Sequence, residues 1–384
     1  MLNAAKCAGV LLGLCMAAAL LFLVEQLRRD GIREEAVAGP VLSECDGAIQ
    51  ELVIHYLPES RDIVVKAYSD FLSQLHGEVT VHVVCANSEA FNELAARAGP
   101  VSCKLSPVIV RHEMTCWSRD RWLGLAPCRP NKPVTLLAPR GEAGAGLWAQ
   151  RGGDQRIAGE IAAASGGRVR AQRSLLYFDG GDFAADRQTV FVSPAVISRN
   201  LQRTVRSREE LLETLSDKLK RRIVLLEEAP EHHVGMYMMP ARSRIAVVGD
   251  PGLAARSLYG GAKGNRVEEM LASGGGADFG EETQRRFDAV AAQCAEAGYR
   301  VIRIPVVPGR DGRTYLTYVN VIQDWRDGRA VVYMPVYRGA DVLNDAAAKV
   351  WGRLGYTIRR VDCTETFRHF GSLHCLVNVL RRIP

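Results

Sequence analysis

The sequence predicts an α/β protein in which repeats of strand–strand–helix–strand form a closed, pseudo-symmetric single domain. Three observations lead to this prediction. Beyond residue 46 the chain alternates β-rich runs with helical runs, a pattern typical of α/β proteins. Three segments in the second half resemble one another, each with a strand, a polar turn containing Arg, an apolar strand and Pro. Each is followed by a helix signal and one more strand, and about five such units fit the length of the chain.

The repeated segments can be followed along the chain. They cover residues 177–194, 233–251 and 318–335. Ser207 and Glu210 form a capping box in front of the first helix. Apolar residues at i, i+3, i+4 and i+7 predict the other two helices at 287–294 and 343–354. Single strands are expected at 223–226, 301–305 and 356–361, and less clear copies of the unit at 47–90 and 106–170.

Composition and charge limit the classes of function. The chain has 384 residues, of which 47% are hydrophobic and 24% charged, as in ordinary globular proteins. Its net charge of +6 comes from Lys and Arg that are spread along the chain, so we expect no nucleic-acid partner. None of the ten cysteines belongs to a C-x-x-C pair, which argues against a zinc or thioredoxin-like site. We therefore expect neither a metal nor a cofactor.

The N-terminal segment differs in composition from the rest of the chain. Residues 8–24 form a run of 17 residues without a charge, which predicts an N-terminal hydrophobic helix just long enough to cross a bilayer. We expect residues 1–24 to be an uncleaved signal anchor, which makes the membrane a partner and localises the protein there. The alternative is a signal peptide that is cleaved on export. Positive charges flank the run on both sides, so the side of the membrane stays open. Residues 25–46 are expected to be a linker, and 47–384 the catalytic domain.

Four local signals carry reactive side chains. They are Trp117-Ser118-Arg119-Asp120, Asp179-Gly180-Gly181-Asp182, His232-His233 and Gly371-Ser372-Leu373-His374-Cys375. Taken alone, each has an ordinary structural explanation, such as a surface ion pair, a turn or a buried thiol. Together they supply a nucleophile, a base and carboxylates, and each lies at a strand end in a different repeat. A closed arrangement of the repeats brings these strand ends to one centre.

This set of side chains suits chemistry on a guanidinium group. A guanidinium is planar, permanently charged and a poor electrophile, so carboxylates must hold it while a soft thiolate attacks its carbon. An imidazole must protonate the departing nitrogen and afterwards activate water. A thiolate near an imidazolium also has a depressed pKa, which keeps it nucleophilic near neutral pH.

The tail GSLHCLVNVLRRIP resembles the end of the guanidino-group-modifying enzymes, in which a G-x-[x]-H-C element closes the chain. This superfamily includes agmatine, arginine and peptidyl-arginine deiminases, dimethylarginine dimethylaminohydrolases and amidinotransferases. YVNVIQDWRDGRAVVYMPVY and FDGGDF are similar to further segments of the family. The resemblance implies the five-bladed α/β propeller called pentein, and we expect Cys375 in its closing strand.

The resemblance also implies a role for each motif residue. Cys375 matches the nucleophile, His233 the general acid/base, and Asp179 the acidic residue that orients the His. Asp120 matches the carboxylate that binds the guanidinium, and Asp182 is expected to add a contact to the substrate. The implied activity is hydrolysis of a small guanidino compound or an arginine-containing substrate, by a deiminase or dimethylargininase-like reaction. It passes through a covalent thiouronium intermediate on Cys375.

One position departs from the family pattern. Deiminases and amidinotransferases generally have His-x-Asp, with the Asp as second carboxylate on the guanidinium, whereas this chain has Gly235 there. Dimethylarginine hydrolases also lack that Asp, so hydrolysis stays open, and Asp182 or Glu113 are candidate replacements. Two alternatives remain beside the hydrolase. One is an amidinotransferase that passes the amidino group to an amine, and the other is a non-catalytic, membrane-anchored protein that binds a guanidino ligand.

Overall fold

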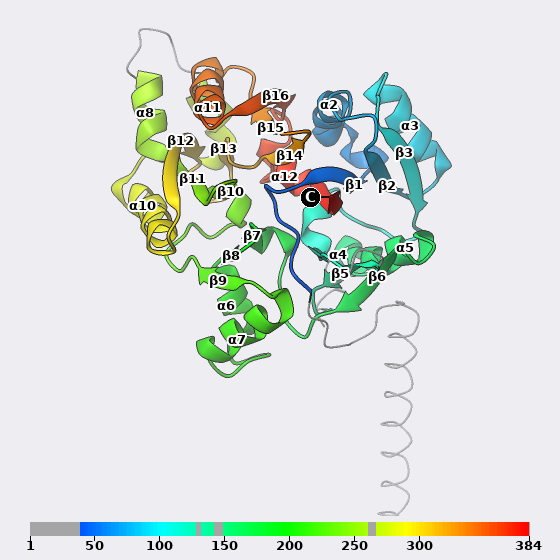
Figure 1. Ribbon diagram of the computed structural model, residues 1–384. Helices are drawn as coiled ribbons and strands as arrows, with labels where there is room; N and C mark the ends of the chain where they lie inside the picture. The colour runs from blue at the N-terminus through cyan, green and yellow to red at the C-terminus, as the bar shows by residue number, and fades with distance from the viewer. Residues whose placement is uncertain (1–38, 128–131, 142–148, 260–265, 384) are drawn as a thin grey trace, which may run out of the picture.

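The computed structural model describes residues 39–127, 132–141, 149–259 and 266–383. The strands of these residues form five sheets. In Figure 1 the sheets follow one another in chain order around a common centre, and most of the helices lie on the outside. The predicted mixed α/β class is confirmed.

The strands of each sheet are close together in the sequence, except in the first sheet. That sheet has the order β17-β1-β2-β3 and contains Val377–Ile383, Ala48–His55, Thr80–Cys85 and Lys104–Ile109. The second contains β4 (Leu123–Leu125), β5 (Val134–Ala138) and β6 (Val169–Arg173). The third contains β7 (Phe183–Ala185), β8 (Thr189–Val192) and β9 (Arg222–Leu225). The fourth contains β10 (Met238–Ala241), β11 (Ile245–Asp250), β12 (Arg300–Pro308) and β13 (Tyr315–Thr317). The fifth contains β14 (Ile322–Arg326), β15 (Arg329–Val336) and β16 (Tyr356–Asp362).

Each sheet repeats one local pattern. Its first two strands are antiparallel, and its second and third strands are parallel. A parallel pair needs a crossover connection, and here the crossover contains a helix. The crossover helices are α2 (Arg61–Leu72), α5 (Ile157–Ala164), α7 (Arg208–Leu219), α10 (Glu281–Glu296) and α11 (Asp341–Arg353). The predicted strand–strand–helix–strand unit therefore occurs in every sheet.

The ends of these helices follow from the sequence. The Ser207 hydroxyl accepts the backbone N–H of Glu210 at 3.2 Å, which caps the start of α7 as the capping box predicts. Gly298 and Gly355 have φ of 87° and 85°, just after α10 and α11. This left-handed backbone favours glycine, and it turns the chain into the strand that follows each helix.

The last strand of the chain pairs with the first. β17 runs antiparallel to β1, from Ile383 opposite Ala48 to Val377 opposite Ile54, so the two ends of the fold lie in one sheet. Cys375 lies just before this strand, in the short helix α12 (Leu373–Leu376), and not in the closing strand where we expected it. The difference has a physical reason, because the backbone N–H of Cys375 bonds to the Ser372 carbonyl and turns the chain out of the extended conformation.

A second contact joins the tail to the turn η2 (Ser118–Arg121). The amide of Asn378 donates to the backbone carbonyls of Ser118, Arg119 and Trp122, at 3.2, 3.4 and 3.1 Å. The Ser118 hydroxyl donates in return to the Leu376 carbonyl at 2.7 Å. Since Asn378 and Ser118 are buried, these bonds fix Asp120 and Cys375 relative to each other.

Residues 39–46, which belong to the predicted linker, pack inside the fold. Their backbone bonds to the second and third sheets, with Leu42 N–H on the Gly124 carbonyl at 2.8 Å and Glu44 N–H on the Ala185 carbonyl at 2.7 Å. Val41, Glu44 and Cys45 are buried. In Figure 1 this blue segment crosses the middle of the ring before it enters β1. These residues are therefore part of the domain's interior.

The predicted membrane localisation is corrected. Among the described residues, 39–127, 132–141, 149–259 and 266–383, no helix has the length and apolar character needed to cross a bilayer. The run at 8–24, from which the anchor was predicted, lies outside the described residues.

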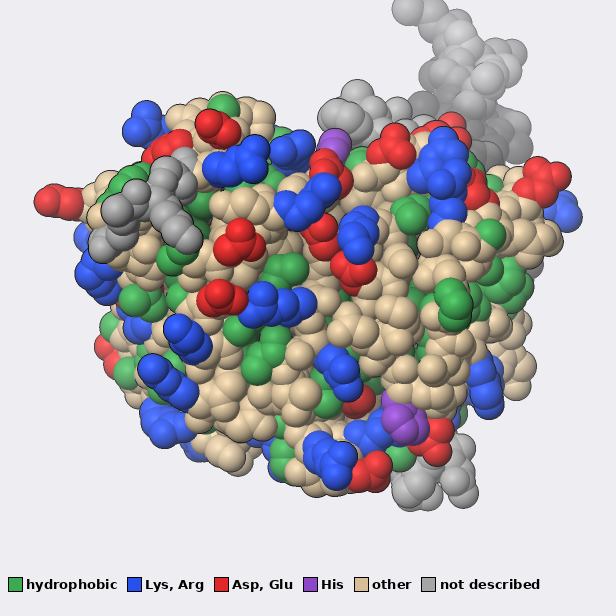
Figure 2. Space-filling view, turned by 90° about the horizontal axis from the view of Figure 1, so that it is seen from above, with side chains coloured by type: hydrophobic (Ala, Val, Ile, Leu, Met, Phe, Trp, Pro, Cys, Tyr) green, Lys and Arg blue, Asp and Glu red, His purple; other side chains and the backbone are tan. Residues whose placement is uncertain are grey.

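Charges on the surface are mixed in sign. Figure 2 shows Lys and Arg side chains interspersed with Asp and Glu over the face seen from above. Apolar side chains are instead gathered between the sheets and the outer helices, where Trp122, Trp351, Tyr318 and Phe287 are fully buried. The apolar area removed from water there is the main favourable contribution to folding.

Replacing Asn378 by Ala tests the contact between tail and turn. We expect a loss of about 2 to 3 kcal/mol in the free energy of unfolding, because three buried carbonyls lose a donor at once. Denaturant unfolding measures this loss. The control is Asn92→Ala on the exposed side of α3 (Ser88–Ala98), which should change stability by less than about 0.5 kcal/mol. Equal effects of the two substitutions would contradict the structural role of Asn378.

Candidate active site

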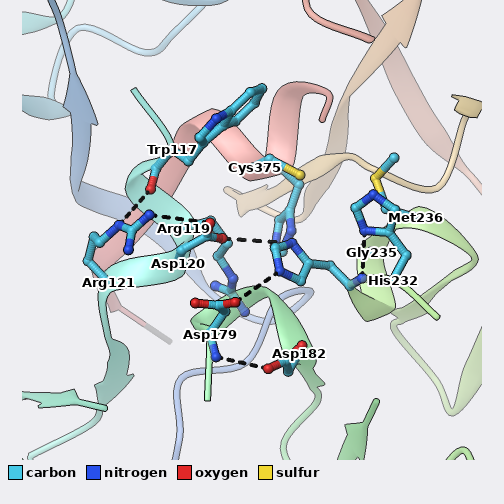
Figure 3. A network of polar contacts seen from close by, with 12 residues as sticks. Trp117, Arg119, Asp120, Arg121, Asp179, Asp182, His232, Gly235, Met236 and Cys375 are labelled. Atoms are coloured by element: carbon cyan, nitrogen blue, oxygen red, sulfur yellow. Dashed lines mark hydrogen bonds and ion pairs between the residues drawn. The ribbon is translucent and has the colours of Figure 1, made fainter. Parts of the chain in front are cut away.

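One pocket of about 630 Å³ contains all five residues expected to act on the substrate. They are Cys375, His233, Asp179, Asp120 and Asp182. The volume is in the range of about 300–1,000 Å³ that is typical of small-molecule sites. Figure 3 shows that Asp120, Asp179, Asp182 and Cys375 come from separate segments of the chain. The structure thus brings together residues that are up to 255 positions apart, from Asp120 to Cys375.

The Asp-Gly-Gly-Asp sequence forms a tight turn beside the imidazole. Asp179 caps the turn η4 (Gly180–Asp182), and its backbone N–H donates to the Asp182 carboxylate at 2.8 Å. A Cβ on Gly181 would lie 2.5 Å from Nδ1 of His233, and one on Gly180 would lie 2.2 Å from the Arg119 carbonyl. The two glycines are therefore needed because the backbone passes so close to its neighbours.

His233 lies between two carboxylates. Its Nδ1 is 3.7 Å from Oδ1 of Asp120, and its Nε2 is 3.8 Å from Oδ2 of Asp179, as the dashed lines in Figure 3 mark. Burial by itself would lower the pKa of His233. Asp120, Asp179, Cys375 and Asp182 outweigh this effect and hold the pKa well above the ordinary value. The imidazole is therefore protonated at neutral pH and can give a proton away.

Asp182 and Asp179 share an internal guanidinium. Arg199, from α6 (Ala195–Asn200), contacts Asp182 Oδ2 at 2.6 Å through Nη1 and Asp179 Oδ2 at 3.0 Å through Nη2. Burial raises the pKa of Asp182 to about 6, although Arg199 acts in the opposite direction. Asp182 is fully buried, and Asp179 is the more accessible of the two carboxylates. Arg199 thus balances much of the negative charge in the turn.

Cys375 lies at the wall of the pocket and is 4% exposed. Its Sγ is 3.6 Å from Nδ2 of Asn320, which also donates to the Gly235 carbonyl at 2.9 Å. The Asn320 side-chain oxygen accepts the backbone N–H of His374 at 2.8 Å. Asn320 therefore holds the helix that carries the thiol against the turn that follows His233.

Gly235 does not face the open pocket. It lies in the turn η5 (Val234–Met236), and a Cβ on it would meet Asn320 Nδ2 and His374 Nδ1, each at 3.1 Å. Asn320 also contacts Cys375 Sγ, and His374 is the residue before Cys375. The place where the family pattern has a carboxylate is therefore filled by an amide and an imidazole. Glu113, a candidate replacement, lines a different pocket beside β3.

The other two histidines of the motifs differ from His233 in their surroundings. Burial lowers the pKa of His232 to about 3, and its ring contacts the ring of Tyr315 edge to face. Burial also lowers the pKa of His374, whose Nε2 is 3.2 Å from Oε2 of Glu44. Both imidazoles are therefore neutral at pH 7.

Three residues that matter to the geometry were not identified from the sequence. Asn320 lies in the segment that resembles the family, so a signal for it was present. Arg199 lies at the end of a short helix, and Glu44 lies in the stretch that we predicted to be a linker. Neither has a local pattern around it, because their roles come from contacts with distant parts of the chain.

The raised pKa of His233 predicts a dependence of stability on pH. A group whose pKa is higher in the folded chain stabilises it fully below the unfolded pKa, which is about 6.5 for His. This stabilisation is lost as the pH rises through the folded value, by about 1.4 kcal/mol for each unit between the two. In wild type, the free energy of unfolding should therefore decrease above pH 6.5 through this group. We expect this decrease to be absent in His233→Gln. His76→Gln, at an exposed position, should leave it unchanged. Parallel pH curves for wild type and His233→Gln would contradict the assignment.

Comparison with known proteins gives matches of structure only. No protein-family model matches the chain, and no curated protein matches its sequence. The agmatine deiminase of C. jejuni, as a Cys-to-Ser variant with substrate bound, matches with a TM-score of 0.64 at 12% identity, over 90% of this chain and 97% of that one. The agmatine deiminase of Enterococcus faecalis matches with a TM-score of 0.63 at 13% identity, over 91% of this chain and 99% of that one. A Porphyromonas gingivalis protein assigned as an arginine deiminase matches with a TM-score of 0.64 at 17% identity, over 88% of this chain and 97% of that one.

These matches extend over nearly the whole of both chains, while little of the sequence is shared. Fold alone does not determine activity. The chain has the fold of the agmatine and arginine deiminases.

Proposed function

We propose that this protein is a cysteine-dependent hydrolase of a guanidino compound, with Cys375 as its nucleophile. The observation that carries the proposal is the single pocket in which Cys375, a protonated His233 and the carboxylates of Asp120 and Asp179 meet. A nucleophile, an acid and anionic groups for a cationic substrate are the parts that this reaction needs.

The reaction has two halves that use the same residues. The Cys375 thiolate attacks the guanidinium carbon and forms a C–S bond, while His233 gives its proton to the departing nitrogen. The C–N bond breaks, and ammonia or an amine leaves. In the second half, neutral His233 takes a proton from water, whose oxygen attacks the thiouronium carbon. The C–S bond then breaks, which releases a ureido product and restores the thiolate.

The carboxylates take different parts in this proposal. Asp120 and Asp179 flank His233 at the pocket, so they hold the positive charge of the substrate beside the acid that acts on it. Asp182 was expected to bind the substrate. Because it is fully buried on Arg199 and on the Asp179 backbone, we propose that it supports Asp179.

The solved structures support this proposal because they share the fold of this chain and include agmatine deiminases. Two of them are agmatine deiminases, and one holds substrate after a Cys-to-Ser substitution. We extend to this chain the class of reaction, hydrolysis of a C–N bond in a guanidino group. We also propose that its five sheets are the blades of the pseudo-symmetric pentein propeller.

Replacing Cys375 by Ala tests the nucleophile. We expect release of ammonia or amine to fall by at least about 10⁴-fold, because no other group replaces the attacking sulfur. Release of ammonia or amine from arginine, methylarginines, agmatine and arginyl peptides measures it. Cys85→Ala, at the end of β2 and outside the pocket, should retain turnover. Turnover that survives Cys375→Ala would rule out this nucleophile.

The same panel separates the alternatives. An amidinotransferase would release the amine only when an acceptor amine is added, whereas a hydrolase needs water alone. A protein that only binds the ligand would leave Cys375 unreactive towards a haloacetamidine at neutral pH. Burial raises the pKa of Cys85 and Cys103 to about 11 and of Cys116 to about 12. These thiols should therefore react little with the haloacetamidine at neutral pH.

Replacing Gly235 by Asp tests whether the site lacks a carboxylate that would bind the substrate. We expect Gly235→Asp to lower kcat/KM by at least about 10-fold, because the new side chain displaces Asn320 and His374 and so moves the thiol. Steady-state kinetics on the best substrate measures this change. Gly235→Ala adds the Cβ without the charge and is the matched control. A higher kcat/KM in Gly235→Asp would show that a second clamp had been missing.

A further inference from the structure

Glu44 reaches the centre of the fold from a segment outside the recognised motifs. Its backbone N–H bonds to the Ala185 carbonyl at 2.7 Å, and its side chain is 8% exposed. One carboxylate oxygen, Oε1, accepts Nη2 of Arg119 at 2.6 Å. The other, Oε2, lies 3.2 Å from Nε2 of His374. A single buried carboxylate thus contacts two side chains, Arg119 and His374, that are far apart in the sequence.

Both partners of Glu44 immediately precede a residue of the proposed reaction. His374 is followed by Cys375, and Arg119 is followed by Asp120. Arg119 also donates to the Phe183 carbonyl at 2.9 Å, directly after Asp182. We infer that Glu44 is a positioning residue for the proposed reaction, holding the thiol and the guanidinium-binding carboxylate in register through His374 and Arg119. This inference rests on the proposed function.

Charge gives the contact a second effect. Burial by itself would raise the pKa of Glu44, but Arg119, His374 and Arg382 outweigh it and lower the value to about 2. Glu44 is therefore ionised at neutral pH, and with neutral His374 it balances the charge of Arg119. Removing the carboxylate leaves an uncompensated guanidinium in the interior, next to the residues around His233.

That uncompensated charge would act on His233. A nearby positive charge disfavours the imidazolium form, so the loss of Glu44 lowers the pH up to which His233 keeps its proton. Several groups already face this imidazole from the elements packed around it. They are Asp120 on η2, Asp179 and Asp182 on η4, Arg199 on α6, the adjacent His232, and His374 and Cys375 on α12. None of these groups changes in a Glu44 variant, so a shift reports the lost carboxylate.

Three variants of the full chain separate charge from geometry. Glu44→Gln keeps a hydrogen-bonding side chain of the same length but loses the charge. Glu44→Asp keeps the charge but is one methylene shorter. Asp46→Asn is the matched control, because Asp46 lies two residues further along the same segment and contacts Ser43 and Arg187. Circular dichroism and thermal unfolding establish that each variant is folded.

We expect kcat to fall by about 10- to 100-fold in Glu44→Gln, as a small misplacement of reacting groups does. The alkaline limb of its pH–rate profile should move to lower pH. Glu44→Asp should have a lower kcat, while the alkaline limb of its pH–rate profile stays near that of wild type. Asp46→Asn should match wild type in both kcat and the alkaline limb. Wild-type kcat and an unshifted limb in folded Glu44→Gln would overturn the inference.

A double variant covers the case in which Glu44→Gln does not fold. Glu44→Gln with Arg119→Met removes the carboxylate together with the guanidinium that it binds, and leaves His374 without its carboxylate. We expect it to fold and to keep the reduced kcat. A wild-type kcat in this variant would also overturn the inference.

Thiol labelling separates this inference from the proposed function. Modification of Cys375 by iodoacetamide, followed by mass spectrometry of its peptide across pH, needs no substrate. We expect the labelling profile of Glu44→Gln to differ from that of wild type, because His374, which precedes Cys375, loses its contact with the carboxylate. Coincident profiles for wild type and Glu44→Gln would defeat the positioning role whatever the turnover. A shifted profile without turnover of any guanidino compound by wild type would instead defeat the proposed function alone.

Discussion

The hydrogen bonds between the tail and the turn at Ser118 are the constraint on which the site depends. Asn378 donates to three carbonyls of that turn, and Ser118 donates back to Leu376, so thiol and carboxylate are fixed by backbone contacts. The pairing of β17 with β1 brings the tail to this point. Closure of the fold and assembly of the pocket therefore depend on the same contacts.

Charge within the pocket follows from this geometry. Asp120 and Asp179 lie on either side of His233, and their attraction for the imidazolium exceeds the cost of burying it. Guanidinium groups limit the excess of negative charge, since Arg199 binds the Asp-Gly-Gly-Asp turn, Arg119 binds Glu44 and Arg121 lies 3.5 Å from Asp120. The result is an imidazole with a raised pKa between two carboxylates at the pocket. A substrate with positive charge and a leaving nitrogen suits such a site.

Local patterns in the sequence predicted most of the elements but little of what lies between them. The helix of Ser207 and Glu210 and the strands at 301–305 and 356–361 occur as expected, because capping and periodicity are local properties. Glu44 escaped prediction because its two partners are 75 and 330 residues away. Gly235 was interpreted as a lost carboxylate, and only the structure shows that Asn320 and His374 fill its surroundings.

The central claim is that the sulfur of Cys375 bonds to the guanidinium carbon of the substrate. Acid quenching during turnover, followed by mass spectrometry of the peptide that contains Cys375, tests this claim most directly. The account predicts a covalent amidino adduct on Cys375 that appears with substrate and disappears as the ureido product accumulates. Turnover without an adduct on Cys375, or with the adduct on another residue, would contradict it.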